Sequence, residues 1–567
     1  MVKVKRIESL WVPDSLERVW MISFEFRGVT SSGGLGAAVH AISTSLVKRG
    51  TKVTVIMPSH GRHMDGLFRS KLKLQEIATS VSGVRKGLDG MSYPFKLGFE
   101  RGELDGVEIV LVKGLDYDTG RLMDSWSVYE FSMEKSALLT RGVEHLISRL
   151  NLGEVPSLIH VHDWHSVVPG VKAKMSLEER RVVVPLVYTV HLLNKVGAPW
   201  HYASEDWSGL ENCNHYIWMV SKHELRRTKD VWDLCEGKIE KFGLYEADLI
   251  TSVSKSYLLN DVLPFVGGFA ENKSCVIYNG TDWDVNQIKG YGVSIAGSDR
   301  RDVIRERLLS SLKDYRFVPS DYNVGNVLWS HRTRLGIRDD WTYEPLERGQ
   351  LVLFAGRLVY QKGVDLLLRA FRGVINKIPD ARLVILGIPS DDFGLLQDII
   401  EKASELKDNV RLMAVSSMDQ NLFKLWHYSA SILAMPSRWE PFGITAIEAM
   451  ASGTPVVASA VGGLVEIVDD LRGSENGNGF LVERENINSI TSSILDSLYL
   501  SIFSETGDPS WLNNVTQSIK EKNWNKVREN AIRKVDSTFR WDKIAERASD
   551  CYSKAIVMAK YRAMAYL

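Results

Sequence analysis

Residues 431–452, SILAMPSRWEPFGITAIEAMAS, join a predicted strand to a predicted helix through a loop that carries charge and glycine. The aliphatic run Ser431–Ala434 predicts a buried strand, and Ile444–Ser452 has the spacing of a helix. Glu440 precedes this helix, where capping alone would explain a carboxylate. Capping does not explain Glu448, which stands about one turn into the helix among apolar neighbours. We therefore interpret both carboxylates as acceptors of hydrogen bonds from sugar and ribose hydroxyls.

The same order of strand, loop and helix recurs on both sides of this stretch. Strands are predicted in the first half at Val19–Glu25, Lys52–Met57, Val107–Val112, Leu158–Val161, Pro185–Val190, Asp248–Ser252 and Ser274–Ile277, and in the second half at Leu351–Ala355, Arg382–Leu386, Val410–Met413, Ser431–Ala434 and Val456–Ala458. Helices are predicted between them, including Gly36–Arg49, Phe131–Leu150, Val364–Ile378, Leu395–Leu406, Ile444–Ser452 and Ile487–Leu500. Such alternation predicts an α/β protein with parallel sheets, and it occurs twice. Two doubly wound domains would face each other across a cleft, because ligands bind at the strand C-termini of such sheets.

Two segments interrupt the alternation and mark the domain organisation. We expect a first domain over residues 1–285, a second over 286–540, and a C-terminal helix over 541–567 that crosses back to the first domain. The segment 286–350 is charged and irregular apart from a helical stretch at Arg301–Leu312, so we interpret it as a linker followed by an insertion. A second, polar insertion covers 504–525. Neither insertion has a role that the sequence assigns.

Composition excludes several classes of protein. The 567 residues carry 70 basic and 70 acidic side chains, so the net charge of zero argues against wrapping nucleic acid or lying on an anionic membrane. The four cysteines, Cys213, Cys235, Cys275 and Cys551, form no Cys-x-x-Cys pair and are expected to be buried or free thiols in a reducing compartment. We expect no signal peptide at Met1–Arg6, which lacks an apolar run, and no apolar stretch approaches the roughly 18 residues of a membrane span. We expect a cytoplasmic protein.

Two glycine loops between a strand and a helix have the composition of phosphate or sugar sites. Gly33 and Gly34 precede a helix, and a dinucleotide fingerprint fails there because Val39 occupies the third glycine position. A plain tight turn remains the alternative. Gly462 and Gly463 form a similar loop after the strand Val456–Ala458.

The loop Arg357–Gly363 carries two cations, Arg357 and Lys362, at the expected C-terminal edge of a parallel sheet. Such a pair suits a diphosphate, and the alternative is a solvated surface pair. The stretch His160–His165 places three histidines at a strand end. Zinc binding is one interpretation, but a neutral histidine that donates to a sugar hydroxyl fits a glycine-lined cleft better.

Taken together, these loops resemble GT-B retaining glycosyltransferases, and specifically glycogen and starch synthases of the archaeal type. The residues that carry the resemblance are Phe24-Glu25-Phe26 before Gly33-Gly34-Leu35, Pro58–Arg62, His160–His165, Tyr188–Lys195, Ala247-Asp248 with Val253-Ser254, Tyr278–Asp282, Gly356-Arg357 with Gln361-Lys362-Gly363, Glu440–Gly443 and Phe539-Arg540-Trp541. The resemblance spans about residues 18 to 560. Two positions depart from the family pattern: Ser31 stands where a lysine is usual, and Glu130 is the best match for an acidic residue that is typically Asp.

The resemblance implies an enzyme that transfers glucose, with retention, from ADP-glucose or UDP-glucose to the non-reducing 4-OH of an α-1,4-glucan such as glycogen. It implies no metal and no other cofactor, two Rossmann-like domains, an acceptor side on the first domain and nucleotide-sugar binding on the second. The implied catalytic residues are Arg357, Lys362, Glu440 and His162. The implied donor-binding residues are Gly33, Gly34, Glu448, Phe442, Gly443, Gly462 and Gly463, and the implied acceptor or sugar-binding residues are Glu130, His191 and Asn194.

Charge development supports these roles, because a departing diphosphate gains negative charge that Arg357 and Lys362 would stabilise without a metal.

Three alternatives stay open: the same fold acting on a small acceptor of the trehalose or sucrose type, a non-catalytic glucan-binding scaffold, and a sugar-nucleotide epimerase.

Overall fold

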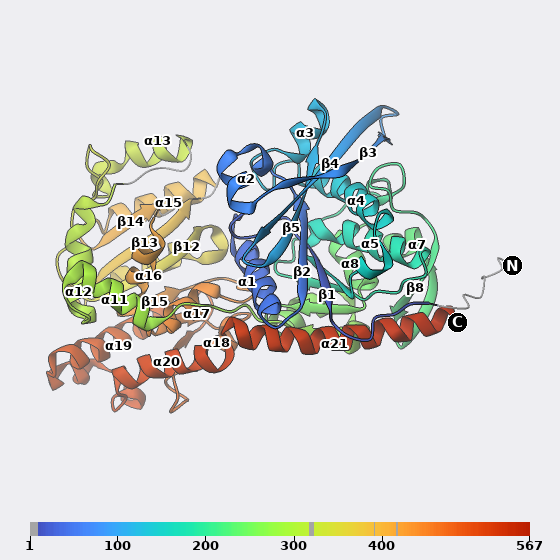
Figure 1. Ribbon diagram of the computed structural model, residues 1–567. Coiled ribbons are helices and arrows are strands. Elements are labelled where there is room, and N and C mark those ends of the chain that lie inside the picture. The colour runs from blue at the N-terminus through green and yellow to red at the C-terminus, as the bar shows by residue number, and fades with distance from the viewer. Residues whose placement is uncertain (1–9, 317–321, 390–391, 415–417) are drawn as a thin grey trace. The chain divides into compact units, whose positions relative to one another are not determined.

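The computed structural model describes residues 10–316, 322–389, 392–414 and 418–567 (Figure 1). The stretch Met1–Arg6, where no signal peptide is expected, lies outside the described residues. The chain forms two compact units: Met1–Asn279 together with Trp541–Leu567, and Gly280–Arg540.

The first unit is built on a nine-stranded sheet in the order β11-β10-β7-β6-β1-β2-β5-β4-β3. Its strands are β1 (Arg18–Ile22), β2 (Lys52–Pro58), β3 (Gln75–Lys86), β4 (Ser92–Leu104), β5 (Val107–Gly114), β6 (Leu158–His162), β7 (Leu186–Val190), β10 (Leu249–Ser252) and β11 (Ser274–Val276). The pairs that β4 makes with β3 and β5 are antiparallel, and the other pairs given for this sheet are parallel. β3 and β4 were not predicted from the sequence; one face of β3 is exposed and the other is only half-buried apart from Arg85, so β3 has no apolar run.

Helices cover this sheet, and a separate hairpin of β8 (Asn214–Met219) and β9 (Lys222–Arg227) accompanies it. The helices are α1 (Gly34–Lys48), α2 (Gly66–Leu72), α3 (Tyr117–Met123), α4 (Ser132–Ser148), α5 (Val167–Glu179), α6 (Trp200–Ala203), α7 (Thr228–Leu234), α8 (Ile239–Glu246), α9 (Lys255–Tyr257), α10 (Leu263–Val266) and α21 (Trp541–Tyr566). Apolar residues of α1 and α21 share one buried cluster with β1, β2 and β5, so the last helix of the chain completes the core of the first unit.

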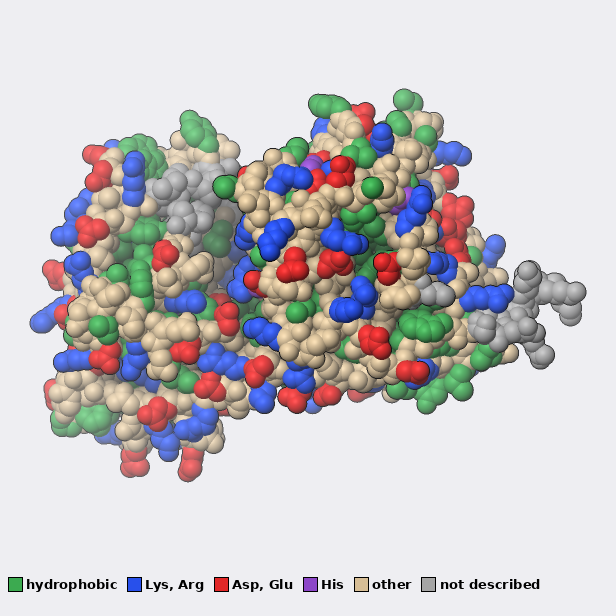
Figure 2. All heavy atoms as spheres, in the orientation of Figure 1, with side chains coloured by type: hydrophobic (Ala, Val, Ile, Leu, Met, Phe, Trp, Pro, Cys, Tyr) green, Lys and Arg blue, Asp and Glu red, His purple; other side chains and the backbone are tan. Residues whose placement is uncertain are grey.

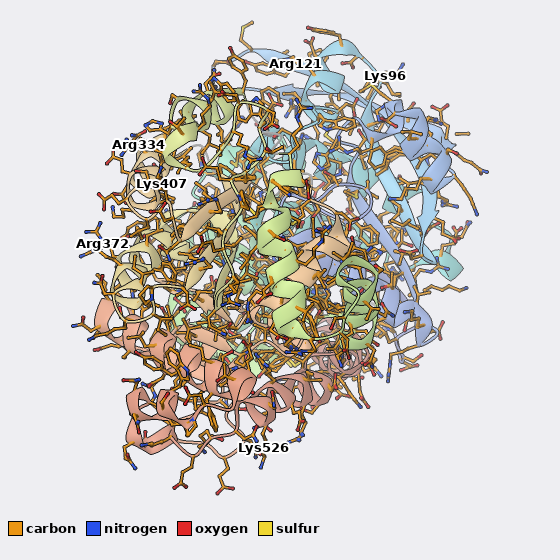
Figure 3. All side chains as sticks on the ribbon, turned by 90° about the vertical axis from the view of Figure 1, so that its left-hand side faces the viewer. Lys96, Arg121, Arg334, Arg372, Lys407 and Lys526 are labelled. Atoms are coloured by element: carbon orange, nitrogen blue, oxygen red, sulfur yellow. A yellow bond between two sulfur atoms is a disulfide. The ribbon has the colours of Figure 1, made fainter. Side chains whose placement is uncertain are left out.

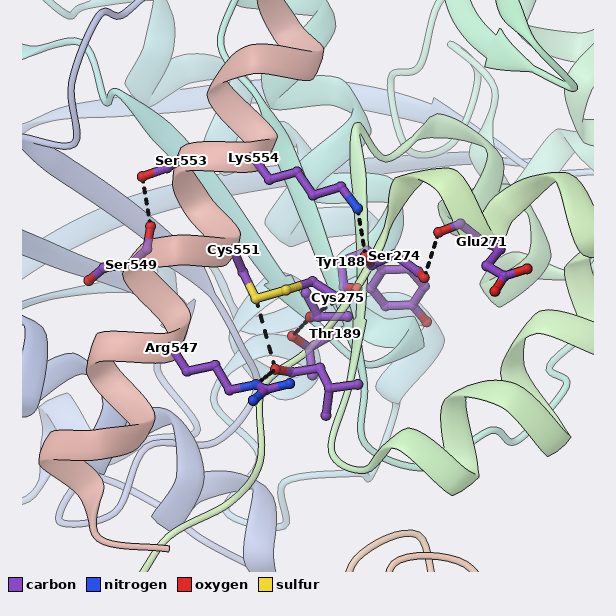
Figure 4. The surroundings of a disulfide bond; sticks show 12 residues. Tyr188, Thr189, Glu271, Ser274, Cys275, Arg547, Ser549, Cys551, Ser553 and Lys554 are labelled. Carbon is purple, nitrogen blue, oxygen red and sulfur yellow. Dashed lines mark hydrogen bonds between the residues drawn. A yellow bond between two sulfur atoms is a disulfide. The ribbon is translucent and has the colours of Figure 1, made fainter. Parts of the chain in front are cut away.

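A disulfide joins Cys275 on β11 to Cys551 on α21, with Cα atoms 6.0 Å apart (Figure 4). The expectation of four unpaired thiols is therefore wrong for these two, while Cys213 and Cys235 are free. The sequence spacing of 276 residues gives no hint of this pair, since only the docking of α21 brings the two sulfurs together. Arg547 of α21 donates to the carbonyl of Val276 at 2.7 Å, beside the disulfide.

The second unit contains a six-stranded, fully parallel sheet in the order β14-β13-β12-β15-β16-β17. Its strands are β12 (Leu351–Leu358), β13 (Arg382–Pro389), β14 (Val410–Ala414), β15 (Ile432–Met435), β16 (Val456–Ser459) and β17 (Gly479–Val482). Its helices are α11 (Val285–Ala296), α12 (Arg301–Ser310), α13 (Tyr322–Ser330), α14 (Val364–Ile375), α15 (Phe393–Ser404), α16 (Gln420–Ser429), α17 (Ile444–Ala451), α18 (Leu464–Ile467), α19 (Ile487–Thr506) and α20 (Trp524–Thr538). The expected α/β class in two units is confirmed, with the difference that the sheet of the first unit has two antiparallel pairs at one edge.

The segment 286–350 is more ordered than its composition indicates, because α11, α12 and α13 lie largely within it. The glycines of α11 conceal this helix in the sequence. A Cβ at Gly292 would come 2.6 Å from Cδ1 of Ile304, so the missing side chain lets α11 pack closely on α12.

Acidic and basic side chains are interspersed over the face of the molecule in Figure 2, in keeping with the net charge of zero. Within the described part of the chain, the helices include none with the length and apolar character that a membrane crossing requires.

Candidate active site

Three loops of the second unit meet at the C-terminal edge of its sheet. They follow β12, β15 and β16, which are neighbours in the sheet. Gly363 has a φ of +66°, and a Cβ there would come 2.2 Å from the carbonyl oxygen of Pro436. Gly462 has a φ of +49°, and a Cβ there would lie 1.8 Å from the carbonyl oxygen of Glu440. The glycines are therefore required by the close approach of one loop backbone to another.

Lys362 and Glu440 form the central pair of these loops. Nζ of Lys362 lies 2.5 Å from Oε2 of Glu440, and both side chains are largely shielded from solvent. Ser437 donates its hydroxyl to the same carboxylate oxygen at 3.3 Å, and the N–H of Gly463 donates to the Glu440 carbonyl at 3.0 Å. The pair therefore joins a cation that could meet a phosphate to a carboxylate that could meet sugar hydroxyls.

Arg438 fixes the loops and was not predicted from the sequence. Its guanidinium makes a bidentate pair with Asp365 at 2.9 and 2.7 Å, and its Nε lies 2.8 Å from Oε1 of Glu485. It also donates to the carbonyl of Tyr360 at 2.7 Å. The hydrogen bonds to Asp365 raise the pKa of Arg438 further above its ordinary value. An arginine between Ser437 and Trp439 carries no signal of its own, because its partner Asp365 lies 73 residues earlier.

The other predicted residues of the second unit differ in their exposure. Arg357 is exposed at the end of β12, on the same strand-to-helix connection as Lys362. Glu448 lies half-buried on α17. Phe442 is buried, and its ring packs edge-on against Phe539 at a centroid distance of 5.7 Å, so its side chain belongs to the core. Gly443 has a φ of +113° at the N-cap of α17.

In the first unit, His162 and His191 lie next to each other at the ends of β6 and β7. Nδ1 of His162 lies 3.0 Å from Nε2 of His191, so one ring donates and the other accepts. Burial lowers the pKa of His162 well below its ordinary value and that of His191 to about 4, which makes both rings neutral near pH 7. Nε2 of His162 is buried and has no hydrogen-bond partner among the described residues. This nitrogen is available to a hydroxyl ligand.

The other two histidines of this stretch differ: His160 has partners at both ring nitrogens, whereas Nδ1 of His165 is buried without a partner among the described residues. Nδ1 of His160 lies 2.8 Å from the hydroxyl of Tyr552, and its Nε2 lies 2.6 Å from Oγ1 of Thr189, so both nitrogens have partners. His165 stacks on Phe24 with ring centroids 4.7 Å apart. Nothing supports the zinc interpretation: in the described residues there is no group of three or more His, Cys, Asp or Glu side chains that could hold a metal ion.

Asp163 holds the loop that bears His191 and was not predicted. Its carboxylate accepts from the N–H of His191 at 2.8 Å and of Leu192 at 3.2 Å. Burial raises the pKa of Asp163 to about 7. Its φ of +57° is unusual for a residue with a side chain, and such conformations concentrate at functional sites. No sequence signal distinguishes it from the histidines beside it.

The glycine loop of the first unit is already occupied by a carboxylate. Oε2 of Glu25 accepts from the N–H of Ser32 at 2.8 Å and of Gly33 at 3.2 Å, and the hydroxyl of Tyr129 donates to its other oxygen. Glu25 is buried and takes the place of a phosphate in front of α1, which begins at Gly34. A Cβ at Gly33 would meet no atom within 4 Å, so the loop is open on its outer side.

Glu130 and Asn194 are both exposed. Asn194 lies three residues after His191, and its N–H donates to Oε1 of the buried Glu240 at 2.9 Å. Its side chain donates to the carbonyl of Leu192 at 3.2 Å. Glu130 lies just ahead of α4, apart from the loop of His191 in sequence.

Comparison with known proteins decides the family. Residues 18–271 match the family model described as the starch synthase catalytic domain, and residues 339–502 match that of glycosyl transferases group 1. The chain belongs to the glycogen and starch synthase family. It is a GT-B glycosyltransferase, and the family resemblance inferred from its loops is confirmed.

Several relatives of this synthase cover most of its length. A glycogen synthase of Clostridioides difficile is 25% identical over 560 residues, which cover 94% of this chain and 99% of the relative. Soluble starch synthase 2-2 of Oryza sativa is 24% identical over 555 residues, which cover 96% of this chain and 70% of the relative. An uncharacterised glycosyltransferase of Methanocaldococcus jannaschii is 27% identical, with 56% of this chain and 63% of its own covered.

Solved structures share the fold. The catalytic domain of starch synthase IV from Arabidopsis thaliana superposes with a TM-score of 0.66 at 18% identity, covering 96% of this chain and all of that chain. A sucrose-phosphate synthase from Thermosynechococcus elongatus gives a TM-score of 0.53 at 18% identity, covering 94% of this chain and 98% of that chain. At these identities the likeness concerns the fold alone.

Proposed function

We propose that this family member is a glycogen synthase that transfers glucose, with retention, from ADP-glucose or UDP-glucose to the non-reducing 4-OH of an α-1,4-glucan. The observation that carries the proposal is the pair of Lys362 and Glu440, held 2.5 Å apart where three parallel-strand loops meet. The Clostridioides difficile relative is named a glycogen synthase, and the Arabidopsis structure was solved with ADP and acarbose bound.

In this proposal the donor binds mainly to the second unit. Breaking the bond between glucose C1 and the phosphate oxygen places negative charge on the diphosphate, which Lys362 and Arg357 stabilise. Arrival of the diphosphate draws Lys362 from its pair, and Glu440 then accepts hydrogen bonds from glucose hydroxyls. Glu448 holds the ribose. The backbone of Phe442–Gly443 and of Gly462–Gly463 lies against the donor, where side chains would obstruct it.

The first unit is proposed to bind the glucan acceptor and also to contact the sugar that is transferred. The unpartnered Nε2 of His162 meets a hydroxyl of the transferred sugar near its 6-OH, while His191 and Asp163 hold that ring in place. Asn194 and Glu130 are exposed and are proposed to contact the acceptor.

Gly33 and Gly34 are proposed to lie against the donor diphosphate. Because the N–H of Gly33 already donates to Glu25, the loop contributes close approach rather than that N–H.

The leaving-group charge is proposed to be met by arginine and lysine rather than by a metal ion. Activity is then expected to survive EDTA. Loss of most activity on chelation, with recovery on adding Mg²⁺ or Mn²⁺, would contradict this part of the proposal.

The test of the function follows labelled glucose from ADP-glucose and from UDP-glucose into ethanol-precipitable glycogen, using the full chain. Label in the precipitate, dependent on Lys362 and Glu440, supports a synthase. Label in a soluble disaccharide indicates a small acceptor, an epimerised donor indicates an epimerase, and glycogen binding without turnover indicates a scaffold.

A further inference from the structure

A cavity of about 490 Å³ opens on the second unit, away from the donor loops. Its walls come from α11, α12, α19 and α20, and include Lys289, Arg301, Glu505 and Arg528. Arg301 donates to the carbonyls of Tyr428 and Ser452, which lie four residues before the first residues of β15 and β16. The cavity therefore adjoins the N-terminal edge of the sheet, whereas the donor loops leave these strands at their C-terminal ends.

The cavity carries more positive charge than the protein compensates. Three guanidinium groups, those of Arg301, Arg305 and Arg528, lie around one carboxylate, Glu505. Nη1 and Nη2 of Arg305 donate to the two carboxylate oxygens of Glu505 at 3.1 and 2.8 Å. In the described chain, Arg528 has no carboxylate within 4 Å, and its hydrogen bond to Ser501 is 3.5 Å long. Its Nε is buried and has no partner among the described residues.

Burial and the neighbouring arginines lower the pKa of Arg301 to about 9, and burial lowers that of Arg528 to about 10. Both groups therefore remain cationic near pH 7. Arg301 relies on backbone carbonyls and Thr454 rather than on an acid. At the rim, Arg300 is compensated by Asp302 at 2.5 Å, while Glu529 is exposed. A shielded cation without a counter-charge is costly, and an anion in the cavity would relieve that cost.

The starts of three helices lie in the cavity lining, and two of them are capped by side chains of the protein. Asp284 accepts the N–H groups of Asn286 and Gln287 at α11, and Asn523 accepts those of Asn525 and Lys526 at α20. The start of α12 at Arg301 has no side-chain cap, and such a helix end favours negative charge. Both segments that the sequence left without a role, 286–350 and 504–525, contribute to this lining.

We propose that this cavity binds a phosphate-bearing small molecule, a second anion site separate from the donor loops. The planar fork of arginine suits phosphate oxygens, and the volume leaves room for an organic group beyond the phosphate. The chemistry is shared by free phosphate, a sugar monophosphate and a nucleoside monophosphate. The inference does not depend on the proposed transferase activity, because it concerns binding alone.

The test is calorimetric titration of the full chain with inorganic phosphate, glucose 1-phosphate and AMP, each up to about 5 mM. Arg528→Gln is compared with Lys526→Gln, an exposed cation that projects from the same helix and does not line the cavity (Figure 3). We expect at least one probe to bind the wild type and Lys526→Gln equally, and Arg528→Gln about tenfold or more weakly. If glucose 1-phosphate or AMP binds more tightly than inorganic phosphate, the ligand has an organic group. If all three probes bind with equal affinity, the ligand is phosphate itself.

A second measurement guards against a merely structural role. Without ligand, Arg528→Gln is expected to melt at the wild-type temperature or higher, because it removes a shielded cation that lacks an acid partner. Lys289→Gln, at a half-buried wall position where Nζ lies 3.8 Å from Oδ2 of Asp299, should weaken the probe about two- to fivefold without changing the fold. The proposal is overturned if no probe binds, if Arg528→Gln binds as tightly as the wild type, or if Arg528→Gln melts several degrees lower.

Discussion

The loops Gly33–Gly34 and Gly462–Gly463 look alike in sequence and differ in what their surroundings do. In the first unit, the buried Glu25 accepts the N–H groups of the loop, so the protein supplies its own anion. In the second unit, Gly462 lets the loop backbone reach the carbonyl of Glu440, beside the pair that Glu440 makes with Lys362. A glycine turn before a helix thus does not define a phosphate site; the side chain that reaches it from elsewhere decides.

The same contrast extends to the charges and covalent bonds of the two units. The first unit contains all four cysteines, a disulfide and a buried group in which Glu246 meets Lys174 and His215. The second unit has shielded arginines that no acid balances and an exposed Arg357. Among the described residues, buried cations without an acid partner occur in both units, however: Nζ of Lys273 in the first unit donates to the carbonyls of Tyr245 and Ala247, as Arg301 does to carbonyls in the second. The disulfide and the partnered Glu246 are therefore what set the first unit apart.

Reduction of the disulfide should produce the largest loss of stability, and only in the first unit. The bond between Cys275 and Cys551 closes a loop of 276 residues, for which chain entropy gives a stabilisation of at most about 5–6 kcal/mol. Calorimetric scans with and without reductant should show a lowered melting transition. Cys551→Ser should melt at the reduced temperature and no longer respond to reductant. Cys213→Ser is the control and should respond to reductant as the wild type does. If Cys213→Ser instead behaved like Cys551→Ser, the disulfide would not be the cause of the stability loss.

Removing a cation of the donor loops should chiefly affect turnover. Lys362→Ala or Arg357→Ala is expected to lower kcat by roughly 10²–10³, because each is proposed to meet charge that develops on the leaving diphosphate. Glu440→Ala should also lower turnover while leaving the affinity for free ADP or UDP nearly intact. Steady-state kinetics and titration on variants with unchanged melting temperature test this. Lys377→Ala, an exposed position in the same unit, should match the wild type. Near-normal kcat in both cation variants would move the leaving-group role elsewhere.

Acid should weaken the first unit through its buried carboxylate. Burial alone would raise the pKa of Glu246, but the charges of His215 and Lys174 and their hydrogen bonds hold it at about 2. This group therefore stabilises the fold above pH 4.5, and the stabilisation, on the order of 2–3 kcal/mol, is lost as pH falls from about 4.5 toward 2.

Urea unfolding at pH 3 and pH 7 measures that loss. Glu246→Gln should be less stable at pH 7 and should show a smaller difference between the two pH values than the wild type. Glu521→Gln, an exposed position of the second unit, should keep the wild-type difference. An unchanged pH difference in Glu246→Gln would assign the acid sensitivity to other groups.

A matched pair of glycine substitutions compares the two loops directly. Gly462→Ala places a Cβ 1.8 Å from the Glu440 carbonyl at a positive φ, so we expect a loss of about 1–3 kcal/mol and a kcat at least about tenfold lower. Gly33→Ala meets no atom within 4 Å and should change stability by less than about 0.5 kcal/mol. Kinetics of both variants complete the comparison. If Gly33→Ala lowers kcat while its stability is unchanged, the donor approaches that loop as proposed; if Gly462→Ala has no effect, the close loop contact is not needed.

The sequence by itself determined the features that local residues specify. Aliphatic runs such as Leu351–Ala355 and Val456–Ala458 became strands because their periodicity is contained within a few residues. The loops that end these strands were placed correctly for the same reason, since parallel strands leave a sheet at one edge. The quoted motifs also sufficed to indicate the family. Exposed strands such as β3 were not predicted, because they bury too little apolar surface to produce a hydrophobic pattern in the sequence.

Only the tertiary structure decided which of these residues meet. Lys362 and Glu440 are 78 residues apart, and Arg438 finds Asp365 at a separation of 73, because the sheet order makes β12 and β15 neighbours. The disulfide depends in the same way on α21 returning to β11. A residue's own neighbours in the chain fix its secondary structure, whereas its charge partners come from strand order and helix docking, which local composition does not encode.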